Sequence, residues 1–266
     1  MTKQQLSQLF LITVIVATMF VVGADAQRTA RPTSTRPANP AVQKPREIGA
    51  TAVVLDETLS VLRSRPSLFA DVIQRMRRGR KVQINGVAEA DGVRFYRVAA
   101  HPSTTGWVQS EAVFGQFRTG DDMRLARLVY ASSGFEKLQL ANAFFELFPR
   151  SGLRPSMLLL YGDLIEETSV RLSRDANARL NRHEMAATEA PMHSYYLNFN
   201  LLDRYRRLGI VFLFNPNTRT YHYEGASWRE ITSKFSSSSE ADEARKRLDQ
   251  LREKMGQTSA KQTQPD

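Results

Sequence analysis

The sequence predicts a multidomain α+β protein, with a small β-barrel over residues 48–117 followed by an all-α helical domain over residues 118–255. The first region consists of short runs rich in β-branched and aromatic residues, separated by turn signals, which favours a small barrel. In the second region apolar residues recur three and four positions apart, which favours helices. A chain of 266 residues is long enough for two domains of ordinary size.

The N-terminal residues 1–26 have the pattern of a signal peptide. Lys3 precedes an apolar run over residues 9–22, and Ala24-Asp25-Ala26 matches a cleavage site of small residues. The run is shorter than the roughly 20 residues that a membrane-spanning helix needs. We therefore expect an exported, periplasmic or extracellular protein associated with the cell envelope, without a stable membrane span in the mature chain. Retention of the segment as an anchor is the alternative.

Two further segments lack the apolar content that a packed domain needs. Residues 27–47 combine arginines with prolines, which predicts a disordered linker. Residues 256–266 are polar throughout, which predicts a disordered tail.

The individual elements follow from local patterns. Strands are expected at 51–55, 59–62, 70–76, 82–84, 95–98 and 107–108, with turns at Pro66, Gly79 and Asn85-Gly86. Helices are expected from Asp121 onward and over 135–148, 155–181, 194–208, 226–235 and 240–254. A short hairpin is expected at 210–223, between two of these helices.

One segment of the helical region is echoed further along the chain. Phe148-Pro-Arg-Ser151 and Phe235-Ser-Ser-Ser238 each precede a new helix, and both resemble the turn of a tetratricopeptide-type helical hairpin. They lie 87 positions apart (235 − 148), which is no small multiple of the ~34-residue period of such repeats. A degenerate tetratricopeptide-like array and an ordinary helical bundle both remain open.

No residue pattern indicates catalysis, a cofactor or a metal site. The chain has no cysteine, which excludes thiol nucleophiles and thiolate ligands. His101, His183, His193 and His222 lack the spacing of a ligand set, and each is expected at the surface. The acidic pairs Asp121-Asp122 and Glu166-Glu167 are expected to face water on helices. We therefore expect a non-enzymatic protein with no catalytic residues, no metal and no cofactor.

The net charge of +10 favours an anionic partner. In a cell envelope such partners are phospholipid headgroups, wall polymers and acidic proteins, and nucleic acid is not expected. The alternative is that the charge, which is spread along the chain, only maintains solubility.

Three motifs in the β-rich region carry a family resemblance. Leu62-Arg-Ser-Arg-Pro-Ser67, Arg78-Gly-Arg-Lys-Val-Gln-Ile84 and Thr105-Gly-Trp-Val108 resemble the corresponding parts of the bacterial SH3-like (SH3b) domain. The usual motifs of that family are close to V-R-S-G-P-S, K-K-G-T-K-V and T-G-W-V. Arg65 therefore stands where the family has Gly, which questions a turn with positive φ at this position. The resemblance implies a small barrel that binds a ligand.

This resemblance implies binding of cell-wall peptidoglycan or of peptides. The expected ligand-binding residues are Arg63, Tyr96 and Trp107. For Tyr96 and Trp107 the alternative is packing in the core or at the rim of the barrel. The alternative function is a protein–protein scaffold, in which the tetratricopeptide-like helical domain recruits an envelope protein.

Overall fold

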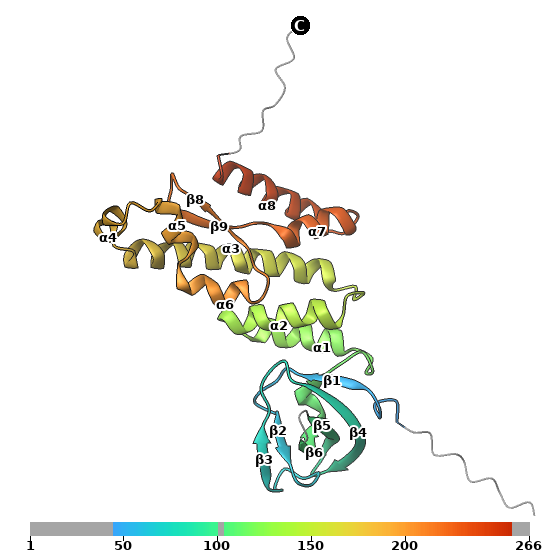
Figure 1. Ribbon diagram of the computed structural model, residues 1–266. Helices are drawn as coiled ribbons and strands as arrows, with labels where there is room; N and C mark the ends of the chain where they lie inside the picture. Colours follow the sequence, from blue (N-terminus) through green and yellow to red (C-terminus); the bar gives the residue numbers. More distant parts are fainter. Residues whose placement is uncertain (1–44, 101–103, 257–266) are drawn as a thin grey trace, which may run out of the picture. The chain divides into compact units, whose positions relative to one another are not determined.

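The computed structural model describes residues 45–100 and 104–256, as a mixed α+β structure in which an antiparallel sheet precedes a helical region (Figure 1). The predicted signal peptide, most of the predicted linker, His101 and nearly all of the predicted tail lie outside the described residues. Within the described ranges, no helix is both long enough and apolar enough to span a membrane.

Seven strands form the antiparallel sheet, in the order β3-β2-β6-β5-β4-β1-β7. Their bounds are β1 Thr51–Val54, β2 Val61–Arg63, β3 Val72–Arg75, β4 Lys81–Ala90, β5 Val93–Ala100, β6 Thr104–Gln109 and β7 Val113–Phe114. A short 3-10 helix, η1 (Ser110–Ala112), connects β6 to β7. The strands expected from the sequence are present, and β4 and β5 are longer than the apolar runs indicated.

The prediction of a turn at Asn85-Gly86 is wrong. Strand β4 continues through these residues with a bulge between Ile84 and Gly86, and the chain reverses at Asp91-Gly92, where φ is 53° and 71°. Both dipeptides suit a two-residue hairpin turn. The later turn adds ladder pairs such as Val87 with Tyr96, so the longer hairpin keeps more backbone groups paired.

Apolar side chains from one face of the sheet form a core of their own. The cluster includes Leu62 of β2, Tyr96 of β5 and Val113 of β7, so strands far apart in the strand order contribute to it. A sheet that brings such strands into one cluster must curl. Among the described residues no strand pairing joins β3 to β7, so the closed barrel expected from the sequence is not observed.

The helical region begins at Asp121. Its bounds are α1 Asp121–Ala131, α2 Gly134–Leu147, α3 Arg154–Arg179, α4 Arg182–Ala187, α5 Met192–Leu197, η2 Asn200–Leu202, α6 Asp203–Arg206, α7 Ala226–Lys234 and α8 Ala241–Lys254. The hairpin expected at 210–223 is formed by β8 Phe212–Asn215 and β9 Thr220–Tyr223.

The single helix expected over 194–208 is wrong, because the chain is broken there into α5, η2 and α6. The break lies at Asn198, whose side-chain amide donates to the carbonyl of Ser194 at 2.9 Å. Phe199 follows with an extended ψ of 120°. Asparagine competes with the helical backbone for hydrogen bonds, so it ends α5 despite the apolar spacing around it.

Helix α3 carries most of the remaining elements. Strand β9 and helix α7 pack along it, and α2 and α8 also contact it (Figure 1). The contact with α7 is closest at Gly162, where the indole of Trp228 lies against the backbone of α3. Trp228 is 2% exposed.

The two echoed segments form the same turn. In the first, the amides of Phe148, Ser151 and Arg154 donate to the carbonyls of Phe144, Phe148 and Ser151. Exactly corresponding bonds, each 87 positions later, run from Phe235, Ser238 and Ala241 to Ile231, Phe235 and Ser238. The φ and ψ angles are −126° and 59° at Phe148 and −131° and 39° at Phe235. The pairs α2–α3 and α7–α8 are therefore joined by equivalent connections.

The sheet and the helices belong to one compact unit. Leu55, which follows β1, and Phe114 of β7 pack in the core of the helical region. Arg78 adds polar contacts, donating to Gln139 at 3.3 Å and forming an ion pair with Glu136.

We predict that Gly162→Ala destabilises the protein by about 1–2 kcal/mol. The added methyl group would lie 2.6 Å from Oγ of Ser227 and 2.7 Å from Cε2 of Trp228, so α7 must move away from α3. Urea unfolding measures the effect. Gly152→Ala is the control, because its methyl group meets no atom within 4 Å. Equal stability of the two variants would contradict the prediction.

Candidate binding site

Two of the three predicted binding residues lie together on one face of the sheet. Arg63 of β2 lies directly opposite Trp107 of β6, and Trp107 lies directly opposite Arg97 of β5. The row continues to Gly86 of β4 on one side and to Val72 of β3 on the other. Directly opposite residues of antiparallel strands project from the same face. We call these five residues the arginine–tryptophan row.

The indole of Trp107 lies along the sheet. A Cβ atom placed on Gly86 would be 3.9 Å from Cη2 of Trp107, the far edge of its ring. The ring thus reaches from β6 past β5 toward β4, across strands that are about 4.8 Å apart. Trp107 is half-buried. At 3.9 Å such a Cβ would be in ordinary van der Waals contact with the ring, so the far edge of the indole lies beside β4.

The two arginines of the row form no ion pair with the residues that the structure describes. Arg63 donates from Nη1 to the carbonyl oxygen of Ala70 at 2.9 Å, and Arg97 is exposed. In the described part of the sheet, the arginines that form ion pairs are Arg78 and Arg94. The face beside the indole is therefore basic and free to meet an anion. Arg65, at the position where the family has Gly, does not adopt positive φ.

Tyr96, the third predicted residue, lies on the opposite face and is 0% exposed. Its ring packs edge-on against Phe117 at 6.1 Å, and its hydroxyl has no hydrogen-bond partner among the described residues. Burial raises the pKa of this hydroxyl. Tyr96 is therefore a packing residue of the sheet core, which is the alternative stated from the sequence. Its neighbour Arg97 lies beside Trp107. Strand alternation alone could have separated the two neighbours.

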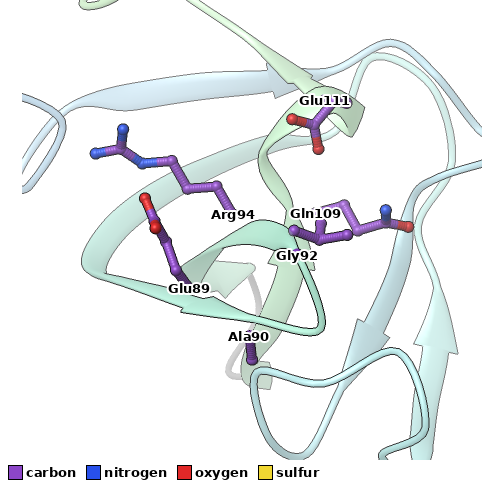
Figure 2. A pocket seen from close by; sticks show the side chains of 7 residues that line it. Glu89, Ala90, Gly92, Arg94, Gln109 and Glu111 are labelled. Atoms are coloured by element: carbon purple, nitrogen blue, oxygen red, sulfur yellow. The ribbon is translucent and has the colours of Figure 1, made fainter. Parts of the chain in front are cut away.

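A pocket of about 650 Å³ adjoins this row near the turn between β4 and β5. Its lining residues are Glu89, Ala90, Gly92, Val93, Arg94, Gln109 and Glu111. Figure 2 shows Glu89 and Arg94 side by side, with Glu111 on another wall. Gln109 lies two residues from Trp107 along β6, so it shares the face of the indole. Arg94 lies two residues from Tyr96 along β5, so Arg94 and Glu89, which lie directly opposite each other, share the other face.

The pocket has an acidic balance. Its one cationic side chain, Arg94, forms an ion pair with Glu47 at 3.0 Å. Glu89 and Glu111 have no cationic partner among the described residues; Glu111 accepts from the hydroxyl of Ser110 at 2.7 Å. An amine fits such a pocket, whereas a carboxylate fits the adjacent arginine–tryptophan row.

A second cluster, which the sequence did not indicate, lies on α3. His222 of β9 is 8% exposed, so its predicted surface position is wrong. Its Nδ1 lies 3.0 Å from Oε1 of Glu166, and Nζ of Lys254 donates to the same oxygen at 2.8 Å. Oε2 of Glu166 accepts from the backbone amide of Tyr223 at 2.8 Å. The expectation that Glu166 faces water is wrong as well, because its side chain is 16% exposed. The same expectation is wrong for Asp121, whose side chain is 2% exposed.

This cluster ties β9 and α8 to α3. Nε2 of His222 lies 3.0 Å from the hydroxyl of Thr220, so the chain of contacts resembles the base and orienting carboxylate of a catalytic triad. Both oxygens of Glu166 are nevertheless occupied by structural partners, namely Lys254 at one and the amide of Tyr223 at the other. Burial by itself raises the pKa of Glu166, but the hydrogen bonds from His222, Lys254 and Tyr223 outweigh it and lower the pKa to about 2.

The other two described histidines lie at the surface. His183 and His193 are exposed, as expected. Within residues 45–100 and 104–256, no group of His, Asp and Glu side chains could hold a metal ion.

Comparison with models of known families, with curated proteins and with solved structures finds no match.

We predict that Glu166→Gln lowers the free energy of unfolding at pH 7 by about 2–3 kcal/mol. The pKa of Glu166 is about 2 in the folded state, against an ordinary value of 4.5. Its stabilisation is therefore complete above pH 4.5 and is lost as the pH falls toward 2. Urea unfolding between pH 7 and pH 3 measures this loss.

Glu167→Gln is the matched control, because Glu167 is exposed on the same helix. We expect the control to lose stability with falling pH as the wild type does. A Glu166→Gln variant whose stability declines as steeply as that of the wild type between pH 5 and pH 3 contradicts the role of this carboxylate.

Proposed function

We propose that this protein is an exported, non-enzymatic envelope protein whose SH3-like module binds cell-wall peptidoglycan or its peptides. The observation that carries the proposal is the indole of Trp107, which lies along the sheet between Arg63 and Arg97, two arginines that form no ion pair with any described residue. Side chains with these properties are suited to a ligand that combines flat apolar faces with negative charge.

Peptidoglycan offers the groups that this face can contact. The C–H faces of a sugar ring can lie on an aromatic ring, and peptide carboxylates pair with arginine guanidinium groups. Free amines of wall peptides suit the carboxylates of Glu89 and Glu111 in the adjoining pocket.

The order of the strands supports the SH3-like interpretation. Strands β4, β5 and β6 form a meander, η1 follows, and β7 returns to pair with β1. The β2–β3 hairpin lies between β1 and β4 in the chain, and it carries the first of the three family motifs.

A second candidate function is a protein–protein scaffold formed by the helical region. The matched turns at Phe148 and Phe235 support a degenerate tetratricopeptide-like arrangement of α2–α3 and α7–α8. Met123 and Tyr130 of α1 are 54% and 56% exposed, seven positions apart on one side of the helix. Such exposed side chains can contact a partner.

We predict that Trp107→Leu and Arg97→Glu each weaken binding to purified peptidoglycan by about fivefold or more. The first change removes the flat ring, and the second places a negative charge beside it. Co-sedimentation of the full mature chain with insoluble peptidoglycan measures the affinity. Arg77→Glu is the control, because Arg77 is exposed and lies outside the arginine–tryptophan row; we expect it to bind within about twofold of wild type after the same change in charge.

The outcomes separate the candidate functions. Absence of wild-type co-sedimentation overturns wall binding, and so does an equal loss of binding in Arg77→Glu and Arg97→Glu. The scaffold is supported instead if the protein does not bind the wall but captures an envelope protein, and if Met123→Glu or Tyr130→Glu abolishes this capture. Release of soluble wall fragments during long incubation contradicts the non-enzymatic proposal.

A further inference from the structure

The helical region contains a small pocket that differs from the pocket of the sheet. Its volume is about 260 Å³, and it is formed by α4, α5 and the turn between β8 and β9. The lining residues are Met185, Ala186, Ala190, Met192, Tyr196 and Arg219. The lining is therefore mainly apolar, with one cationic side chain.

Two backbone distortions adjoin this pocket. Among the described residues other than glycine, positive φ occurs at Asp91, Glu189 and Arg219. Arg219, with φ of 55°, lines the pocket, and Glu189, with φ of 56°, directly precedes the lining residue Ala190. Left-handed backbone is costly for side chains other than glycine and asparagine, and such strain gathers at functional sites.

The strained residue Arg219 is held by a chain of hydrogen bonds. Nδ2 of Asn177 on α3 donates to the carbonyl oxygen of Arg219 at 3.0 Å. The hydroxyl of Tyr196 donates to Oδ1 of the same Asn177 at 2.7 Å. Tyr196 is 3% exposed and stacks on Phe214. One wall of the pocket and its cationic residue are thus fixed by the same asparagine.

The guanidinium of Arg219 has no acidic partner within residues 45–100 and 104–256, although the side chain is half-buried. A half-buried cation without a counter-ion is ready to form charge-assisted, bidentate hydrogen bonds with a carboxylate. The two methionines give the rest of the pocket a flexible apolar lining, which adapts to an unbranched chain.

From these contacts we infer that the pocket binds an amphipathic carboxylate, an unbranched alkanoate whose head group pairs with Arg219 and whose chain lies among Met185, Met192 and Tyr196. At about 30 Å³ for each water-sized group, the volume holds roughly eight or nine such groups. A chain of about seven carbons therefore fills the pocket, with its carboxylate at Arg219. This inference is independent of wall binding by the sheet.

The test titrates the full mature chain, labelled at its methionine methyl groups, with sodium octanoate and with 1-octanol as a chain-matched probe without charge. The signals of Met185 and Met192 are assigned from the variants Met185→Leu and Met192→Leu. We expect octanoate to shift both signals and to bind about tenfold more tightly than octanol, as a charge-assisted hydrogen bond implies.

Arg219→Gly separates binding from stability. Glycine removes the cation and also relieves the strained φ, so we expect a Tm that rises by about 2–4 °C together with a tenfold or greater loss of octanoate affinity. Octanol affinity should stay within about twofold of wild type. Arg174→Ala is the control, because it removes an exposed arginine of α3 that does not line the pocket, and octanoate binding should be unchanged.

Any of the following results overturns the inference. One is the absence of shifts at Met185 and Met192 with octanoate. Another is equal affinity of octanoate and octanol, or full octanoate affinity in Arg219→Gly. The third is a short peptide with a free C-terminal carboxylate and a final leucine that binds more tightly than octanoate, which would identify a peptide end as the occupant.

Discussion

The packing of β9, α7 and α8 on α3 is the constraint on which the helical region depends. This packing requires glycine at position 162, because the indole of Trp228 occupies the space that a Cβ atom would take. It also needs the carboxylate of Glu166, which accepts hydrogen bonds from His222, Tyr223 and Lys254. A half-buried carboxylate with these donors is held in its charged form, so one acidic side chain links three elements that are distant in sequence.

A separate set of contacts joins the sheet to the helical region. Leu55, the residue after β1, and Phe114 of β7 pack in the core of the helical region, so helices contact one end of the strand order. The arginine–tryptophan row begins at the other end, at the edge strand β3, and it crosses β2, β6 and β5. The indole of Trp107 therefore lies several strands from the engaged end. The sheet can hold a ligand without giving up its contacts with the helices.

Local pattern was sufficient for most elements of the fold and insufficient for the sites. The strands and long helices follow from apolar spacing, which depends on near neighbours. Tyr96 was expected to bind a ligand because an aromatic side chain suits a binding face. Strand pairing instead places its neighbour Arg97 beside Trp107, on the face opposite Tyr96. Glu166 and His222 were missed because they are 56 positions apart and meet only when β9 packs on α3. Asn198 shows the reverse case, in which one local hydrogen bond overrides a helical pattern.

The surplus of positive charge has a structural distribution that bears on both proposed sites. Several carboxylates are already paired with arginines inside the fold, namely Glu47, Asp121, Glu136, Asp163 and Glu230. The net charge of +10 leaves other arginines without such partners, and Arg63, Arg97 and Arg219 are among them in the described part of the chain.

These three arginines differ in what a single ion pair can contribute. An ion pair between a ligand and the exposed Arg97 would be weakened by water and salt, so a ligand of the row must make several contacts at once. A polymer with repeated groups meets that requirement. Arg219 is half-buried beside apolar side chains, where one pair is stronger, so a small ligand with one carboxylate is sufficient there.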